Sequence, residues 1–347
     1  MTRTREQTCA APDCTATFIS DGSSRRRYCV DHPGGAGQER RCAFPECDET
    51  FISSVHNRKY CNSHIDRRVQ TYERREKLFE EPREFVEMKI ASVPDGARIL
   101  IINDTQRPFH DPLTMEAVEK FWDDFQPDYE IYGGDIADFY DISTFDRNPT
   151  RRFNLQDELD ECRRWLQHRA ERNPKARRIF IEGNHEDRLR RWLWKYGKDL
   201  AQLRALDVPQ LLGFEELGIE GLKHMSVVDF LGYRIEHGYK ASASKAYPIN
   251  VSRYMAIATG SSGLCGHTHR FSMYAWSDAS GSHSYIENGC LCRFDLEYAP
   301  FPNWQQAFTY GVVVNGKVHL VPVQIYPDGF RAEGEFYPRV GRGRKGK

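Results

Sequence analysis

Five short polar blocks in this 347-residue chain contain residue types that bind metal ions, and each directly follows a predicted strand. In chain order they read Asp104-Thr105-Gln106, Gly134-Asp135-Ile136-Ala137-Asp138, Gly183-Asn184-His185-Glu186, Glu236-His237-Gly238 and Gly266-His267-Thr268-His269. Taken singly, a strand-terminal Asp usually caps a turn or helix, and a single His is usually structural. Together they offer carboxylate, amide and imidazole ligands to a divalent cation. Because such strand ends would converge on one edge of a sheet, the sequence predicts a metal centre there.

The segments between the first three blocks predict alternating strands and helices. Apolar runs typical of buried strands occur at 99–103, 129–133 and 177–183, and helical patterns at 115–125 and 152–172. This alternation implies βαβ units and a largely parallel sheet, whose ligands gather at the carboxyl ends of the strands. Beyond residue 224 the pattern changes to strands and hairpins, and Asn315-Gly316 is a two-residue turn signal. We therefore expect an α/β fold with sheet-rich C-terminal layers.

In this order the blocks resemble the calcineurin-like metallophosphoesterase family. The family pattern is Asp-x-His, Gly-Asp-x-x-Asp/Asn, Gly-Asn-His-Asp/Glu, a separate His, and Gly-His-x-His. Four of the five blocks match it, over about 165 residues. The resemblance implies a β-sandwich flanked by helices. It also implies hydrolysis of a phosphate-ester substrate by water activated between two divalent ions, which could be Mn, Fe, Zn or Mg.

Carried over position by position, the resemblance assigns two metal sites and two catalytic side chains. The first site would consist of Asp104, Asp135 and His269, and the second of Asp135, Asn184, His237 and His267. Asp135 would therefore bridge the two ions. His185 would donate a proton to the leaving oxygen or stabilise its charge, and Asp138 would orient that imidazole. The alternative for Asp138 is an ordinary helix cap.

Several positions leave a choice open. Gln106 stands where the family has His, so it is either a neutral oxygen ligand that biases the first site towards Mn or Mg, or no ligand. We assign the separate histidine to His237 rather than His224, because His237 follows a strand and precedes Gly238, which permits a tight turn. No Asp-Arg-Gly sequence follows Gly134-Asp135, which argues against the protein serine/threonine phosphatase branch. The arginines after the third block are interpreted as a solvated helix face, with phosphate binding as the alternative.

A second constellation lies in the first 65 residues, where a unit of three cysteines and one histidine occurs twice. Its members are Cys9, Cys14, Cys29 and His32 in the first copy, and Cys42, Cys47, Cys61 and His64 in the second. Three thiolates and an imidazole form the closed tetrahedral set that holds structural zinc. The repeat resembles small zinc-ribbon or treble-clef fingers and predicts two structural zinc ions. Basic and aromatic residues before each third ligand would suit phosphate contact; the alternative is a protein-docking or stabilising module.

Composition limits the remaining possibilities. Lys and Arg number 49 against 50 Asp and Glu, so any attraction to nucleic acid must come from local patches. One such patch spans 147–195, with 14 basic and eight acidic residues. No apolar run approaches the roughly 20 residues that span a bilayer, and the first residues lack the apolar core of a signal peptide. We expect a cytosolic, cytoplasmic protein without membrane association.

The predicted organisation has five parts. They are a zinc unit at 1–36, a second at 37–65, a charged helical linker at 66–95, the metallophosphoesterase domain at 96–338 and a basic disordered tail at 339–347. We predict a metal-dependent phosphoesterase, and specifically a nuclease or phosphodiesterase that the zinc units direct to nucleic acid. One alternative is a phosphomonoesterase acting on a small molecule or phosphoprotein. Another is a catalytically inactive protein that binds nucleic acid or protein, with Gln106 as the sign of lost activity.

Overall fold

The computed structural model divides the chain into two compact units, residues 1–82 and 83–347. It describes residues 5–11, 13–20, 38–44, 47–53, 58–64, 86–144, 148, 150–151, 153–238, 250–296 and 302–339. Most of the predicted linker helix and nearly all of the basic tail lie outside these ranges. Among the described residues, no helix combines the length and the apolar character needed to cross a membrane.

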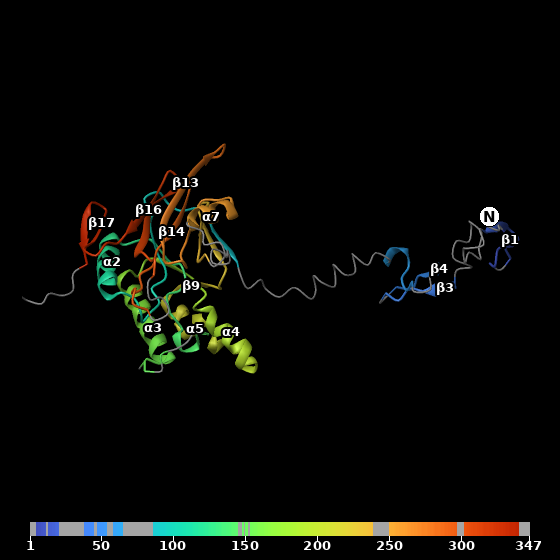
Figure 1. Cartoon of the computed structure of the whole chain (residues 1–347), viewed down its shortest axis with the longest axis horizontal. Coiled ribbons are helices and arrows are strands. Elements are labelled where there is room, and N and C mark those ends of the chain that lie inside the picture. The colour runs from blue at the N-terminus through green and yellow to red at the C-terminus, as the bar shows by residue number, and fades with distance from the viewer. Residues whose placement is uncertain are drawn as a thin grey trace, which may run out of the picture. The chain divides into compact units, whose positions relative to one another are not determined.

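The larger unit contains two six-stranded sheets (Figure 1). The first sheet has the order β16-β15-β6-β7-β8-β9. Its strands are β6 (Arg98–Ile102), β7 (Tyr129–Tyr132), β8 (Arg177–Ile181), β9 (Ile219–Leu222), β15 (Ala307–Val314) and β16 (Lys317–Gln324). Strands β6 to β9 pair in parallel, whereas β15 pairs antiparallel with both β6 and β16. The predicted parallel βαβ core and the hairpin at Asn315-Gly316 are therefore confirmed.

The second sheet has the order β13-β14-β12-β11-β10-β5. Its strands are β5 (Glu87–Ile90), β10 (Val227–Phe230), β11 (Tyr233–Glu236), β12 (Gly263–Cys265), β13 (Phe271–Asp278) and β14 (Gly281–Asn288). Strand β5 pairs in parallel with β10, with Glu87 opposite Val227. It thus joins the sheet, although its residues lie in the range that the sequence assigned to the linker.

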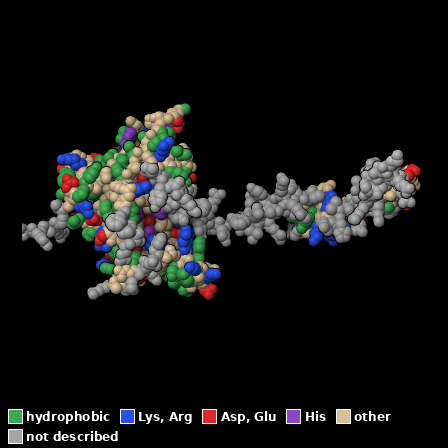
Figure 2. Space-filling model, in the orientation of Figure 1, with side chains coloured by type: hydrophobic (Ala, Val, Ile, Leu, Met, Phe, Trp, Pro, Cys, Tyr) green, Lys and Arg blue, Asp and Glu red, His purple; other side chains and the backbone are tan. Residues whose placement is uncertain are grey.

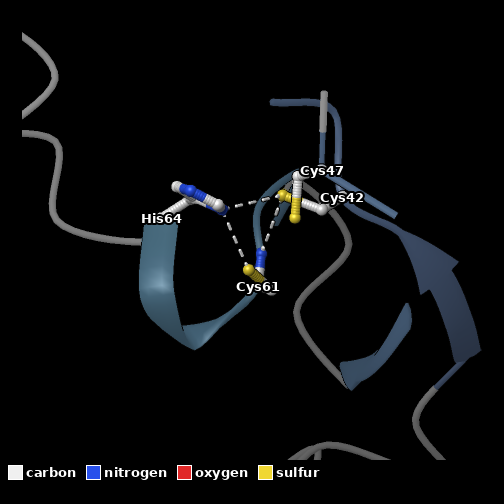
Figure 3. Close-up of side chains that lie close together, drawn as sticks. All are labelled: Cys42, Cys47, Cys61 and His64. Atoms are coloured by element: carbon white, nitrogen blue, oxygen red, sulfur yellow. Dashed lines mark hydrogen bonds between the residues drawn. The ribbon is translucent and has the colours of Figure 1, made fainter. Parts of the chain in front are cut away.

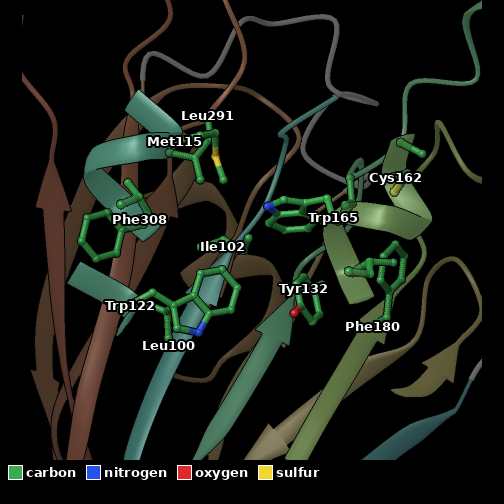
Figure 4. Close-up of a cluster of buried hydrophobic side chains, with 14 of the residues drawn as sticks. Leu100, Ile102, Met115, Trp122, Tyr132, Cys162, Trp165, Phe180, Leu291 and Phe308 are labelled. Carbon is green, nitrogen blue, oxygen red and sulfur yellow. The ribbon is translucent and has the colours of Figure 1, made fainter. Parts of the chain in front are cut away.

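The sheets pack face to face over an apolar core. Ile99 and Ile101 of β6 point into this core, where they meet Val228 of β10 and Ile235 of β11. The alternate residues of β6 point to the opposite face, which α2 (Pro112–Phe125) and α3 (Leu155–Arg172) cover with Trp122 and Trp165 (Figure 4). Because both faces of β6 are covered, the strand reads as a continuous apolar run. Helix α7 (Val251–Thr259) packs on the outer face of the second sheet, which gives the expected β-sandwich flanked by helices.

Local sequence fixes the ends of the two long helices. The Asp111 carboxylate accepts hydrogen bonds from Leu113 N and Thr114 N, and Pro112 occupies the first turn of α2. At α3, Asn154 and Asp157 form a reciprocal capping box. The remaining elements of this unit are α4 (Asp187–Tyr196), α5 (Val208–Leu211), α6 (Phe214–Leu217), β17 (Gly329–Ala332), β18 (Glu335–Pro338) and the short 3-10 helices Tyr140–Ile142, Lys198–Leu200 and Arg204–Leu206.

The smaller unit contains two hairpins with the same local pattern. Strands β1 (Arg5–Thr8) and β2 (Thr17–Ser20) form the first, and β3 (Gln38–Arg41) and β4 (Thr50–Ser53) form the second. The backbone bond from Cys9 N to Ala16 O recurs from Cys42 N to Glu49 O, each at 2.9 Å. The sequence repeat is therefore a structural repeat wherever both copies are described.

Candidate metal centre

The predicted ligands follow strands of both sheets, at the carboxyl ends of those strands. Asp104 follows β6, Asp135 follows β7 and Asn184 follows β8, all in the first sheet. His237 follows β11 and His267 follows β12, both in the second sheet. The expectation that all five blocks meet at the edge of a single sheet is thus wrong. The apolar patterns identify the strands, but they contain no signal that assigns a strand to one sheet or the other.

The first predicted site gathers around Asp104 and His269. The Asp104 Oδ1 and His269 Nε2 atoms are 3.2 Å apart, and the Gln106 side-chain amide lies 3.0 Å from the same imidazole nitrogen. Both Asp104 and His269 are buried. Asp104 Oδ1 accepts no hydrogen bond from any described residue, while Oδ2 accepts one from His267 N at 2.8 Å. A buried carboxylate oxygen that faces an imidazole without a hydrogen bond fits a divalent cation between them.

The second predicted site gathers around His237. Its Nε2 atom lies 3.2 Å from Asp135 Oδ2 and 3.1 Å from Asn184 Oδ1. Its Nδ1 atom lies 3.0 Å from Gly133 O, so Nδ1–H donates to this carbonyl and Nε2 is the ring atom directed at the two oxygens. One ligand atom each from Asp135, His237 and His267 lie within 4.8 Å of one another. This group also fits a divalent cation.

The backbone at these ligands adopts an uncommon conformation. Positive φ angles occur at Asp104 (50°), Gln106 (47°), Asp135 (52°), His267 (71°) and His269 (58°). Residues other than glycine rarely adopt this left-handed backbone conformation, because it costs about 1–3 kcal/mol per residue. Residues that do adopt it are concentrated at functional sites. Gly183 contributes differently, since a Cβ there would collide with the Asp135 carboxylate. The loops are therefore shaped to bring ligand atoms together at some cost in stability.

His185 and Asp138 form a pair beside Asp135. His185 Nδ1 lies 2.7 Å from Asp138 Oδ1, and its Nε2 lies 3.6 Å from Asp135 Oδ2. The backbone N–H of His185 donates to Asp135 Oδ1 at 2.8 Å. His224, the rejected alternative to His237, instead places Nδ1 3.4 Å from the carbonyl of Glu182.

Three neighbours of the centre were not predicted to act there. Arg188, interpreted from sequence as part of a solvated helix face, places Nη2 3.0 Å from His185 Nε2 and donates from Nη1 to Asp138 O at 2.8 Å. Because Arg188 is basic, phosphate binding was the alternative interpretation. The sequence could not predict the direction in which its side chain points. Glu186 accepts four backbone hydrogen bonds from the loops that carry Asp135 and Asn184, and its place in the third block was the available signal. Cys292 Sγ lies 3.8 Å from His269 Nδ1, and no sequence signal indicated it.

Residues 97–279, more than half of the chain, match the sequence profile of the family described as "Calcineurin-like phosphoesterase". The chain belongs to this family. Two curated relatives are the "Gene 54 protein" of Mycobacterium phage L5, 26% identical over 247 residues, and that of Mycobacterium phage D29, 28% identical over 244 residues. Each alignment covers 65% of this chain and 93% of the relative.

Solved structures similar to this calcineurin-like phosphoesterase include two Vps29 proteins. Vps29 from Chaetomium thermophilum is 14% identical, with a TM-score of 0.37 over 70% of this chain and 97% of that chain. Wild-type Vps29 from Entamoeba histolytica complexed with Zn+2 is 10% identical, with a TM-score of 0.36 over 69% of this chain and 99% of that chain.

Electrostatics in the phosphoesterase centre favour a negative carboxylate among imidazoles. Burial opposes ionisation of Asp135, but the charges of His185 and His237 outweigh it and hold the pKa of this carboxyl well below its usual range. Burial, reinforced by the charge of His237, lowers the pKa of His267 to about 4. His267 is therefore neutral at pH 7. At His237, by contrast, burial is outweighed by the charge of Asp135, which raises the pKa to about 10, so His237 would release a proton on binding a metal.

The second zinc unit is assembled in the described residues (Figure 3). One ligand atom from each of Cys42, Cys47, Cys61 and His64 lie within 4.8 Å of one another. His64 Nδ1 lies 3.1 Å from Cys61 Sγ and 3.6 Å from Cys42 Sγ, and the Phe44 ring stacks on His64 at 4.1 Å. This Cys3His group could bind zinc, as its spacing predicts.

The first zinc unit is described only in part. Cys9 and Cys14 occupy the same hairpin positions as Cys42 and Cys47, whereas Cys29 and His32 lie outside the described residues. Four-ligand closure of this unit stays a prediction from the repeat.

Proposed function

We propose that this chain hydrolyses phosphate esters at a centre of two divalent metal ions. Asp104, Gln106, Asp135 and His269 would hold one ion, and Asp135, Asn184, His237 and His267 the other. The observation that carries the proposal is the direct hydrogen bonding between the two groups of ligand residues. Asp104 accepts a hydrogen bond from His267 N, and Gln106 N donates to the Asp135 carbonyl at 3.0 Å. The two ligand groups are therefore in contact, and the Asp135 carboxylate would bridge the two ions.

Ions bound there would neutralise phosphate oxygens and lower the pKa of a water held between them. Protein side chains would stabilise the leaving group. His185 and Arg188 extend one cationic or hydrogen-bonding surface next to Asp135, where a leaving oxygen would gain negative charge. The Asp138 carboxylate lies against Nδ1 of this imidazole and would fix its orientation. Arg188 also holds the Asp138 carbonyl, so the three side chains keep one arrangement.

The substrate class we propose is a phosphodiester in nucleic acid. The second zinc unit supports this with Arg58, whose guanidinium lies 4.8 Å from the centre of the Phe51 ring and donates to Tyr60 O at 3.0 Å. Basic and aromatic groups thus share one surface next to the Cys3His group, as in phosphate- and base-contacting modules. Structural zinc would hold that surface in shape, because so short a segment buries little apolar area.

The test offers purified full chain with Mn a generic diester, a generic monoester, and labelled single- and double-stranded DNA and RNA. We expect metal-dependent turnover of the diester and of nucleic acid, and loss of turnover in Asn184→Ala and His185→Ala. Preference for the monoester would indicate a phosphomonoesterase. Absence of turnover on every substrate, with intact Mn binding by calorimetry, would favour the inactive binding protein and contradict the proposal.

A further inference from the structure

Helix α4 exposes three large aromatic side chains directly beyond the metal centre. Trp192, Trp194 and Tyr196 are 38%, 50% and 64% exposed, whereas the residues that α4 buries are Asp187, Leu189 and Leu193. Exposed apolar surface of this kind in a soluble domain commonly marks an interaction site.

Cationic groups lie close to two of these rings. The Arg190 guanidinium lies 5.1 Å from the Trp194 ring centre and the Lys195 ammonium 4.9 Å from that of Tyr196, while the Trp192 and Tyr196 rings are 5.6 Å apart. Residues 187–198 contain five basic residues and one acidic residue. Figure 2 shows hydrophobic and basic side chains together on the protruding part of the domain where Figure 1 labels α4.

The helix continues from the catalytic block. Asn184, a proposed metal ligand, precedes the first residue of α4 by three positions, and Arg188 in the first turn contacts His185. From there the helix extends for ten residues, or about 15 Å. A polymer with one phosphate at the metal centre could therefore place its next units along α4.

We propose that α4 is a binding platform for single-stranded nucleic acid, with bases stacked on Trp192 and Tyr196, whose rings lie together on one side of the helix, and phosphates near the basic side chains. The inference rests on the proposed phosphodiesterase function. A single strand fits better than a duplex because its bases are available to stack on aromatic rings, and each such contact contributes about 1–3 kcal/mol. Because α4 continues from the catalytic block, a strand bound at the metal centre would reach these rings, which favours nucleic acid over a membrane surface as the occupant. Leu200 and Leu203, about half exposed, extend the apolar surface, so anionic vesicles are the comparison ligand.

The test measures binding of the full zinc-loaded chain to labelled single-stranded DNA and RNA of about 20 nucleotides, by fluorescence anisotropy without added Mn, so that hydrolysis is suppressed. We expect Trp192→Ala/Tyr196→Ala to weaken binding by roughly ten-fold or more. The control Tyr326→Ala/Phe336→Ala removes two exposed aromatics elsewhere and should bind like the wild type. Photo-crosslinking with 5-iodouracil should label peptides that contain 192–196, which separates α4 from any contribution of the zinc units.

Two outcomes would overturn the platform. In the first, the wild type and the α4 variant bind the oligonucleotides with equal affinity and no crosslink to α4 forms. In the second, these residues bind anionic phospholipid vesicles but not oligonucleotides. Mn-dependent hydrolysis of a generic diester is measured in parallel and should be the same in both proteins. If the wild type fails to hydrolyse that diester, the proposed function fails. If turnover is intact and affinity is unchanged, only the platform fails.

Discussion

Glu186→Gln should destabilise the larger unit and weaken its metal centre, although Glu186 itself is not a predicted ligand. The buried Glu186 carboxylate accepts four backbone hydrogen bonds. Oε2 accepts from Asp135 N at 3.0 Å and Gly183 N at 2.7 Å, and Oε1 accepts from Ile136 N at 2.8 Å and Ala137 N at 3.0 Å. These N–H groups belong to the loops that carry Asp135 and Asn184.

The size of the effect follows from these contacts. Glutamine keeps one acceptor oxygen and turns the other into an NH2 group that faces two N–H donors. Leaving each of two buried donors unpaired costs about 1–3 kcal/mol, so the free energy of unfolding should fall by about 2–6 kcal/mol. The amide cannot restore the bonds by a flip, because donors surround both oxygens.

Urea unfolding in EDTA isolates this effect from metal binding, which would itself add stability. Measurement at pH 8 keeps the carboxylate ionised, although burial and the charge of Asp135 raise the pKa of Glu186 to about 7. Calorimetry with Mn should then show weaker binding. As a matched control, Glu215→Gln changes an exposed glutamate near the start of α6 and should leave both quantities unchanged. A loss below about 1 kcal/mol in Glu186→Gln, with unchanged Mn affinity, would refute the reasoning.

Three further predictions test other parts of the chain. Gln106→His adds an imidazole beside His269 and should tighten Zn binding at the first site by roughly ten-fold, or about 1.4 kcal/mol. Competition with a chelating dye measures this affinity. An unchanged affinity would mean that residue 106 does not bind the metal. Burial, with the charge of Asp138, raises the pKa of Glu158 to about 8, so its neutral form is favoured in the folded state. The free energy of unfolding should therefore fall as pH rises from about 4.5 to 8, by up to about 5 kcal/mol, and Glu158→Gln should flatten that fall; parallel pH profiles would contradict this. Cys47→Ser should lower the zinc content by about one ion per chain, measured by plasma emission spectrometry, and expose the β3–β4 amides to hydrogen exchange; full zinc content would argue against the Cys3His site.

The sequence by itself determined which residues could act and what chemistry they offer. Residues of metal-ligand type after the strand ends predicted the metal centre. An apolar run followed by a polar block is a local pattern, so it can be recognised in a single sequence. Strands β6, β7 and β8 and helices α2 and α3 lie within or close to their predicted ranges for the same reason. The Cys3His spacing likewise predicted the group that Cys42 and His64 complete.

Only the tertiary structure decided how those residues meet. Strand β11 joined the second sheet and β8 the first, since sheet membership depends on pairing between segments far apart in the chain. The direction of Arg188 towards His185 depends on where α4 starts against the sheet, which no residue spacing encodes. The same holds for the solvent exposure of Trp192 and Tyr196, because an aromatic side chain on a helix is exposed only where the fold leaves that side of the helix uncovered.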